Sequence, residues 1–218
     1  MIIPNNIIKS MFRNVYFITG TAYAGKSTAV KLLAERYDGI CCGENYHDIF
    51  MKHINRESQP NLSYFDTMRD WQEFISRTPQ QYADWIEGCS KEAESLEIIR
   101  LFQLVSDDKK IFVDTNISLE TLREISDQSR IAIMLCPQSM SVDRFFDRKD
   151  PEKLFILEQI NKAKNSEEAM DNYRECLERI NSREVYERYL NSGFFTIIRD
   201  DSSTIENTLN ELVVHFGF

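Results

Sequence analysis

A nine-residue run near the start of the chain has the glycine, lysine and hydroxyl spacing of a phosphate-binding loop. Its residues are Gly20, Thr21, Ala22, Tyr23, Ala24, Gly25, Lys26, Ser27 and Thr28. Glycine lets the backbone turn so that amide groups converge on an anion, and the helix expected at 27–36 directs its positive N-terminus toward the same anion. The run therefore predicts a site for the phosphates of a nucleoside triphosphate.

Three side chains would complete this site. Lys26 would place its charge on the β and γ phosphates, and the Ser27 hydroxyl would bind the Mg²⁺ that accompanies the nucleotide. Asp114 ends the apolar run 111–113 and is the second expected Mg²⁺ ligand. A chance glycine-rich turn and a turn-forming aspartate are the alternatives, but both features follow predicted strands of one sheet, which favours the nucleotide site.

Further polar side chains follow two of the predicted strands. Thr115 and Asn116 come directly after the expected metal ligand and could orient metal-bound water. Glu44 and Asp48 follow the strand at 39–42, and either carboxylate could accept or orient the proton of a hydroxyl that receives a phosphoryl group. Glu44 is the first candidate and Asp48 the second. The alternative for both is that acidic residues stabilise the start of a helix.

Two arginines lie four residues apart after the fourth predicted strand. Arg144 and Arg148 would project from one face of a helix, where their guanidinium groups could close over the nucleotide and stabilise charge during phosphoryl transfer. The alternative is a solvated helix face, on which the two arginines pair with neighbouring aspartates. Their position after a predicted strand favours the functional interpretation, because parallel sheets bind ligands at the carboxyl ends of their strands.

The apolar pattern predicts an α/β fold with a parallel sheet to position these groups. The expected strands cover residues 15–19, 39–42, 110–114, 130–135 and 194–199. Several of these runs lack polar alternation, which is typical of strands covered on both faces, and helical stretches separate them. Helices are expected at 118–125, 151–163, 168–191 and 203–216, and Pro79 is expected to open a long helix that runs toward Ser106.

The composition limits the classes of partner. The 218 residues include 42% hydrophobic and 28% charged residues, as in ordinary globular proteins, and the net charge of −9 disfavours nucleic acid. No apolar run is long enough to cross a bilayer and no secretory leader is evident, so we expect a cytoplasmic protein with no membrane partner. The five cysteines are expected to be reduced, because an odd number cannot all pair.

The loop at 20–28, Asp114 and the pair Arg144 and Arg148 together resemble the P-loop kinases, in the branch of nucleoside monophosphate kinases, shikimate kinases and chloramphenicol phosphotransferases. This resemblance implies a three-layer fold in one domain, 1–218, with a five-stranded parallel sheet of order 2-3-1-4-5. It also implies a helical acceptor-binding insertion after the second strand, at 43–108, and a mobile arginine-bearing lid after the fourth, at 137–165.

The same resemblance implies roles for individual residues. Lys26 and Ser27 take the phosphate and Mg²⁺ roles, the two arginines take the lid roles, and Glu44 or Asp48 is the acid on the acceptor side. The chain departs from the nucleoside monophosphate kinases at 114–118, where the acceptor-binding arginine is missing, so a nucleoside monophosphate is disfavoured as acceptor. No guanine-recognition motif follows a strand, which makes ATP the default nucleotide.

We therefore expect an ATP- and Mg²⁺-dependent kinase that transfers the γ-phosphoryl group to a hydroxyl of a small metabolite, nucleoside or antibiotic. The alternative is a nucleotide-binding sensor module that hydrolyses ATP slowly or not at all. Either protein could be a monomer or a homodimer, and the sequence leaves the identity of the acceptor open.

Overall fold

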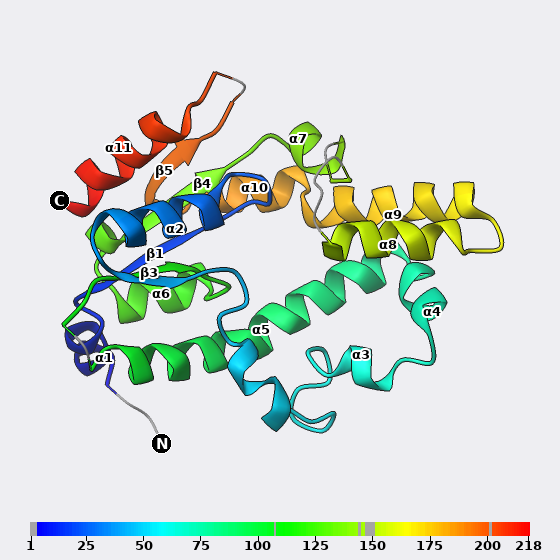
Figure 1. Cartoon of the computed structure of the whole chain (residues 1–218), viewed down its shortest axis with the longest axis horizontal. Helices are drawn as coiled ribbons and strands as arrows, with labels where there is room; N and C mark the ends of the chain where they lie inside the picture. The colour runs from blue at the N-terminus through cyan, green and yellow to red at the C-terminus, as the bar shows by residue number, and fades with distance from the viewer. Residues whose placement is uncertain (1–3, 107, 144, 147–150, 201) are drawn as a thin grey trace.

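A five-stranded parallel sheet organises the structure, a computed structural model that describes residues 4–106, 108–143, 145–146, 151–200 and 202–218 (Figure 1). The strands are β1 (Val15–Gly20), β2 (Ile40–Cys42), β3 (Ile111–Asp114), β4 (Ile131–Leu135) and β5 (Phe195–Ile198). Their order is β2-β3-β1-β4-β5, and every neighbouring pair is parallel. The predicted α/β fold and its strand order are therefore confirmed.

The register of the central strands brings the predicted loop and the predicted metal ligand to one edge of the sheet. Ile18 of β1 lies opposite Asp114, the last residue of β3, and Gly20 lies opposite Met134 of β4. All residues of β3 and β4 are buried, as their continuous apolar pattern predicted. The loop after β1 and the chain after β3 therefore leave the sheet side by side.

Helices cover both faces of the sheet. The elements of these two layers are α1 (Asn5–Met11), α2 (Lys26–Arg36), α5 (Pro79–Leu104), α6 (Leu119–Ile125), η2 (Gln128–Arg130), α10 (Arg183–Leu190) and α11 (Ile205–Phe216). One apolar cluster joins Phe17 and Val113 of the sheet to α1, α6 and the end of α5. A second joins Ile18 and Phe112 to α2 and α11. Successive strand residues thus face opposite layers, as the pleat requires.

The two long excursions from the sheet share a separate apolar cluster. Their elements are η1 (Asp48–His53), α3 (Tyr64–Thr67), α4 (Trp71–Ile75), α7 (Gln138–Asp143), α8 (Pro151–Asn161) and α9 (Ser166–Ile180), together with the first half of α5. The buried members of this cluster are Phe74, Ile75, Tyr82, Ile160, Tyr173, Cys176 and Leu177. We call α3, α4, the first half of α5, α8 and α9 the helical lobe. The segments expected to form a separate insertion and lid thus pack against each other.

The long helix α5 connects the helical lobe to the sheet (Figure 1). It begins at Pro79, as predicted, where Thr78 and Gln81 cap each other's backbone amides. Tyr82 near its start is buried in the lobe, and Leu101 near its end is buried against the sheet. Its 26 residues therefore make one rigid connection between the two cores.

One helix prediction was wrong. The single helix expected at 168–191 is divided into α9 and α10, because the chain is extended at Ser182, whose hydroxyl accepts a hydrogen bond from the Val185 amide and starts a new helix. Among the described residues, no helix combines the length and the apolar character needed to cross a bilayer.

Candidate functional site

Three residues of the loop between β1 and α2 have positive φ angles. The angles are 133° at Gly20, 64° at Tyr23 and 92° at Gly25, and Gly25 forms the N-cap of α2. A side chain at position 20 is excluded, because an added Cβ would overlap the carbonyl oxygen of Met134. Tyr23 adopts a left-handed conformation that few non-glycine residues take, so its surroundings must hold it there.

Three consecutive carbonyl groups of the loop are held by donors from three elements. The Lys26 ammonium donates to the Thr21 oxygen at 3.1 Å, and the Ser141 hydroxyl donates to the Ala22 oxygen at 3.1 Å. The Arg199 guanidinium, which follows β5, donates to the Tyr23 oxygen at 2.8 Å. In a trans peptide the N–H group points opposite to the carbonyl, so these contacts direct the following amides away from the donors.

Ser27 and Asp114 place two oxygen atoms side by side at the start of α2. The Ser27 hydroxyl donates to Asp114 Oδ2 at 2.7 Å, and Lys26 Nζ lies 3.9 Å from Oδ1. Asp114 is only 4% exposed, and this burial raises the pKa of its carboxyl group, against the opposing effects of Lys26 and Ser27. A hydroxyl and a carboxylate in contact fit Mg²⁺, which proteins often hold with one or two side chains while phosphates and water complete its shell.

The described residues include no group of three or more histidine, cysteine, aspartate or glutamate side chains arranged to hold a metal.

The two predicted acceptor-side carboxylates are both exposed, but they lie near different groups. Glu44 is exposed in the turn after β2, close enough to Asp114 for its negative charge to raise the pKa of that carboxyl group. Asp48 begins η1, with its side chain 67% exposed and Oδ1 3.8 Å from Nε2 of the buried His47. The structure thus brings Glu44 toward the expected metal ligand, while Asp48 contacts the histidine.

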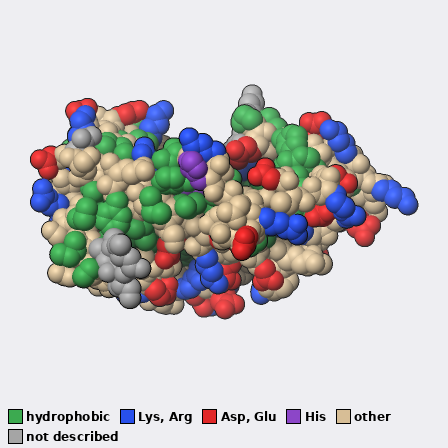
Figure 2. All heavy atoms as spheres, turned by 90° about the horizontal axis from the view of Figure 1, so that it is seen from below, with side chains coloured by type: hydrophobic (Ala, Val, Ile, Leu, Met, Phe, Trp, Pro, Cys, Tyr) green, Lys and Arg blue, Asp and Glu red, His purple; other side chains and the backbone are tan. Residues whose placement is uncertain are grey.

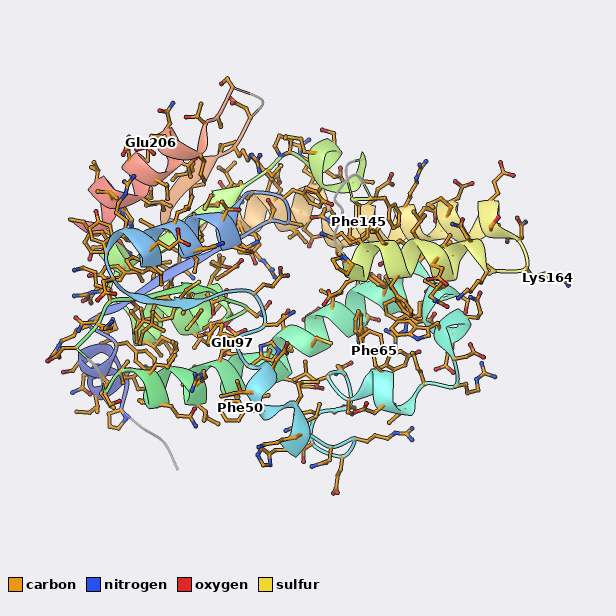
Figure 3. The ribbon with its side chains drawn as sticks, in the orientation of Figure 1. Phe50, Phe65, Glu97, Phe145, Lys164 and Glu206 are labelled. Carbon is orange, nitrogen blue, oxygen red and sulfur yellow. The ribbon has the colours of Figure 1, made fainter. Side chains whose placement is uncertain are left out.

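The predicted lid arginines, Arg144 and Arg148, lie outside the described residues. Their neighbour Phe145 is described, and its carbonyl accepts a hydrogen bond of 2.7 Å from the Tyr23 hydroxyl. Phe145 lies between α7 and α8 in the chain (Figure 3). The Lys153 ammonium lies 5.2 Å from the ring centres of both Tyr23 and Phe145. The loop therefore contacts the segment in which the lid was expected.

A buried carboxylate, Glu97, was not predicted from the sequence. Glu97, on α5, is fully buried and accepts hydrogen bonds from the Thr115 hydroxyl at 2.7 Å and from the Asn116 amide at 3.0 Å. It also accepts one from Asn116 Nδ2 at 2.7 Å and lies 3.2 Å from His47 Nδ1. The donors of Thr115 and Asn116, expected to orient metal-bound water, are thus directed at Glu97.

A signal for Glu97 exists in the helical spacing of α5. Ala93, Glu97 and Leu101 recur at four-residue steps, and all three are buried. A carboxylate on the apolar stripe of a helix must find partners elsewhere in the fold. Helical periodicity could therefore have marked Glu97 as a residue of interest, although it could not have named its partners.

Comparison with models of protein families, with curated proteins and with solved structures finds no significant match to this chain.

Proposed function

We propose that the protein is an ATP- and Mg²⁺-dependent kinase that transfers the γ-phosphoryl group to a hydroxyl of a small molecule. The observation that carries this proposal is the contact between Ser27 and Asp114, 2.7 Å apart at the end of a loop with three positive φ angles, with Lys26 beside them. The resemblance to P-loop kinases is consistent with the order of the strands. It is also consistent with the position of the loop and Asp114 at the carboxyl ends of β1 and β3.

The loop and α2 bind and orient the triphosphate in this proposal. The loop amides and the N-terminus of α2 surround the phosphate oxygens, and Lys26 exchanges its contact with the Thr21 carbonyl for the β and γ phosphates. Ser27 and Asp114 hold Mg²⁺, which when bound neutralises charge on the phosphates. Burial of the Asp114 carboxylate strengthens its interaction with a cation, because the local dielectric constant is low.

The acceptor side removes one proton. The acceptor oxygen bonds to the γ-phosphorus while the bond from that phosphorus to the β–γ bridging oxygen breaks, and ADP leaves. The hydroxyl proton passes to a carboxylate, with Glu44 as first candidate because of its proximity to Asp114 and Asp48 as second. Arg144 and Arg148 remain proposed lid residues that stabilise the transferring group.

A small acceptor agrees with the charge of the molecule. On the face shown in Figure 2, acidic and basic side chains of the described residues alternate in small groups. A protein that binds a nucleic-acid backbone instead concentrates lysine and arginine in one stripe. Together with the net charge of −9, this favours a small hydroxyl compound as acceptor.

Isothermal titration with ATP and Mg²⁺ tests the binding step. The intact protein should bind, and Lys26→Ala should weaken binding by at least about 100-fold, because Lys26 is the phosphate-binding cation. Lys31→Ala is the matched control, since Lys31 lies on the same helix with its side chain 70% exposed. Absence of binding by the intact protein would refute the proposal. Labelled ATP with a panel of hydroxyl compounds then identifies the acceptor.

Two contacts favour a second function, a nucleotide sensor with little turnover. The hydrogen bond from Tyr23 to the Phe145 carbonyl, and that from Ser141 to the Ala22 carbonyl, connect the phosphate loop to the chain that leads into the helical lobe. Occupancy of the loop could therefore change the lobe surface. The sensor is favoured if nucleotide changes the oligomeric state while Glu44→Gln and Asp48→Asn leave every acceptor-dependent activity unchanged.

A further inference from the structure

Glu97 joins three parts of the chain through one buried carboxylate. Its Oε1 contacts His47 Nδ1 and accepts a hydrogen bond from Asn116 Nδ2. Its Oε2 accepts hydrogen bonds from the Thr115 hydroxyl and from the backbone amide of Asn116. Both oxygens are therefore engaged, and the side chain has no exposed surface. A buried carboxylate is costly unless it is fully hydrogen-bonded, so this arrangement holds all of its partners in place.

The partners of Glu97 lie on the two sides of the candidate site. Thr115 and Asn116 directly follow Asp114, the proposed metal ligand. His47 precedes Asp48 and follows Glu44 by three residues, so it belongs to the proposed acceptor side. In Figure 3, Glu97 lies beside η1, near the labelled Phe50. One side chain of α5 thus contacts both the metal side and the acceptor side.

The position of Glu97 along α5 makes it a firm support. It lies four residues before Leu101, which is buried against the sheet, and four residues after Ala93, which is also buried. The negative charge of Glu97 also contributes to the raised pKa of Asp114. The carboxylate is therefore close to the metal side while remaining bonded to other groups.

We infer that Glu97 is a positioning residue that holds the chain after β3, so that Asp114 faces Ser27, and that also fixes the start of η1 through His47. This inference rests on the proposed function, because the groups that Glu97 holds in place are those proposed to bind the metal and the acceptor. Glu97 itself does not contact the nucleotide or the metal. It acts through Thr115, Asn116 and His47.

Glu97→Gln tests the inference, with Glu94→Gln as its matched control. Glutamine keeps the size of the side chain but replaces one acceptor oxygen with an NH₂ group, which faces donors at this site. Glu94 lies on the same helix and accepts from the Ser118 amide at 2.8 Å and the Thr121 hydroxyl at 2.6 Å. Glu94→Gln therefore makes the same chemical change in a neighbouring set of hydrogen bonds that does not include the residues next to Asp114.

The measurement is the affinity for ATP with Mg²⁺ and for ATP with EDTA. We expect Glu97→Gln to reduce the gain in affinity that Mg²⁺ provides by at least about tenfold, as for residues that orient a metal ligand. Its affinity for ATP in EDTA should stay within about twofold, because Lys26 and the loop amides are intact. Glu94→Gln should keep the full gain. A folded Glu97→Gln variant that also keeps it would overturn the inference.

Amide hydrogen exchange provides a readout without nucleotide. Exchange at residues 114–117 should accelerate by at least about tenfold in Glu97→Gln but not in Glu94→Gln. Equal exchange in both variants would contradict the positioning role whether or not ATP binds. Failure of the intact protein to bind ATP would instead count against the proposed function. If Glu97→Gln does not fold, Asn116→Ala, which removes only the side-chain donor, replaces it in both measurements with the same expected direction.

Discussion

The sheet core and the helical lobe are two cores of one chain built in different ways. Around the sheet, aliphatic and phenylalanine side chains of β1, β3 and β4 are fully buried beneath helices on both faces. In the lobe, the buried cluster is smaller and is surrounded by aromatic rings in edge contact, such as Phe74 with Trp85 and Trp71 with Phe155. Continuous apolar burial therefore dominates the sheet core, while ring contacts make up much of the lobe core.

Polar contacts reinforce this difference. The lobe is held across its two segments by hydrogen bonds from side chains to backbone, including Gln72 Nε2 to the Gln159 oxygen and Asn172 Nδ2 to the oxygens of Ile75 and Arg77. The sheet is held by its parallel backbone ladder. We therefore expect the two segments of the lobe to loosen together, and to do so without loss of the sheet.

The largest effect is expected where the loop between β1 and α2 leaves the sheet. Gly20→Ala should destabilise the protein by more than about 4 kcal/mol, because the added methyl group would overlap the Met134 carbonyl at a positive φ angle. Chemical denaturation measures the change. Gly43→Ala is the control, since a Cβ there meets nothing within 4 Å, and it should change stability by less than about 0.5 kcal/mol. Similar stability of the two variants would show that the loop is not held as described.

A substitution of intermediate effect should show whether the sheet core and the helical lobe open independently. Phe74→Ala should cost about 3 kcal/mol and accelerate amide exchange in α8 and α9 while β1 and β4 stay protected, because Phe74 is buried only in the lobe. Leu212→Ala, which removes a fully buried side chain beside the sheet, should accelerate exchange throughout. If Phe74→Ala accelerates exchange equally in the sheet and the lobe, the two cores form one cooperative unit.

The smallest effect concerns the buried carboxylate of Asp114, which ends β3 and accepts a hydrogen bond from Ser27. Burial raises the pKa of Asp114, so the folded state resists its ionisation, and the intact protein loses stability as pH rises through that raised value. Asp114→Asn should therefore stabilise the nucleotide-free protein at neutral pH, by less than about 2 kcal/mol, and this gain should shrink as pH falls toward the ordinary aspartate range.

Thermal unfolding from about pH 3 to about pH 7, which spans the ordinary aspartate range, measures this dependence. Asp108→Asn, which removes a carboxylate from a side chain that is 93% exposed, serves as the control. A stabilisation by Asp114→Asn that grows toward low pH would contradict the direction given for the pKa of Asp114. The same variant should lose Mg²⁺-dependent binding of ATP, which separates stability from the proposed function.

Much of the sheet, and the turn between β1 and α2, were predictable from the sequence. The strand at 110–114 was expected within one residue of β3, because a short apolar run bounded by polar residues is a local signal. The contact between Ser27 and Asp114 followed from two strands ending at one edge of a parallel sheet. In contrast, the break between α9 and α10 was missed, because Ser182 resembles an ordinary residue of a polar helix until its capping role is seen.

The chain's own order of residues determined which groups could bind phosphate, since glycines, Lys26 and Ser27 are neighbours in one turn and need no distant partner to define their chemistry. Only the tertiary structure decided that Glu97 supports this site and that residues far apart in the chain build one helical lobe. Glu97 lies 50 residues from His47 and 18 from Thr115 along the chain. Contacts of that kind depend on how helices cross the sheet, and no local pattern of residues encodes that geometry.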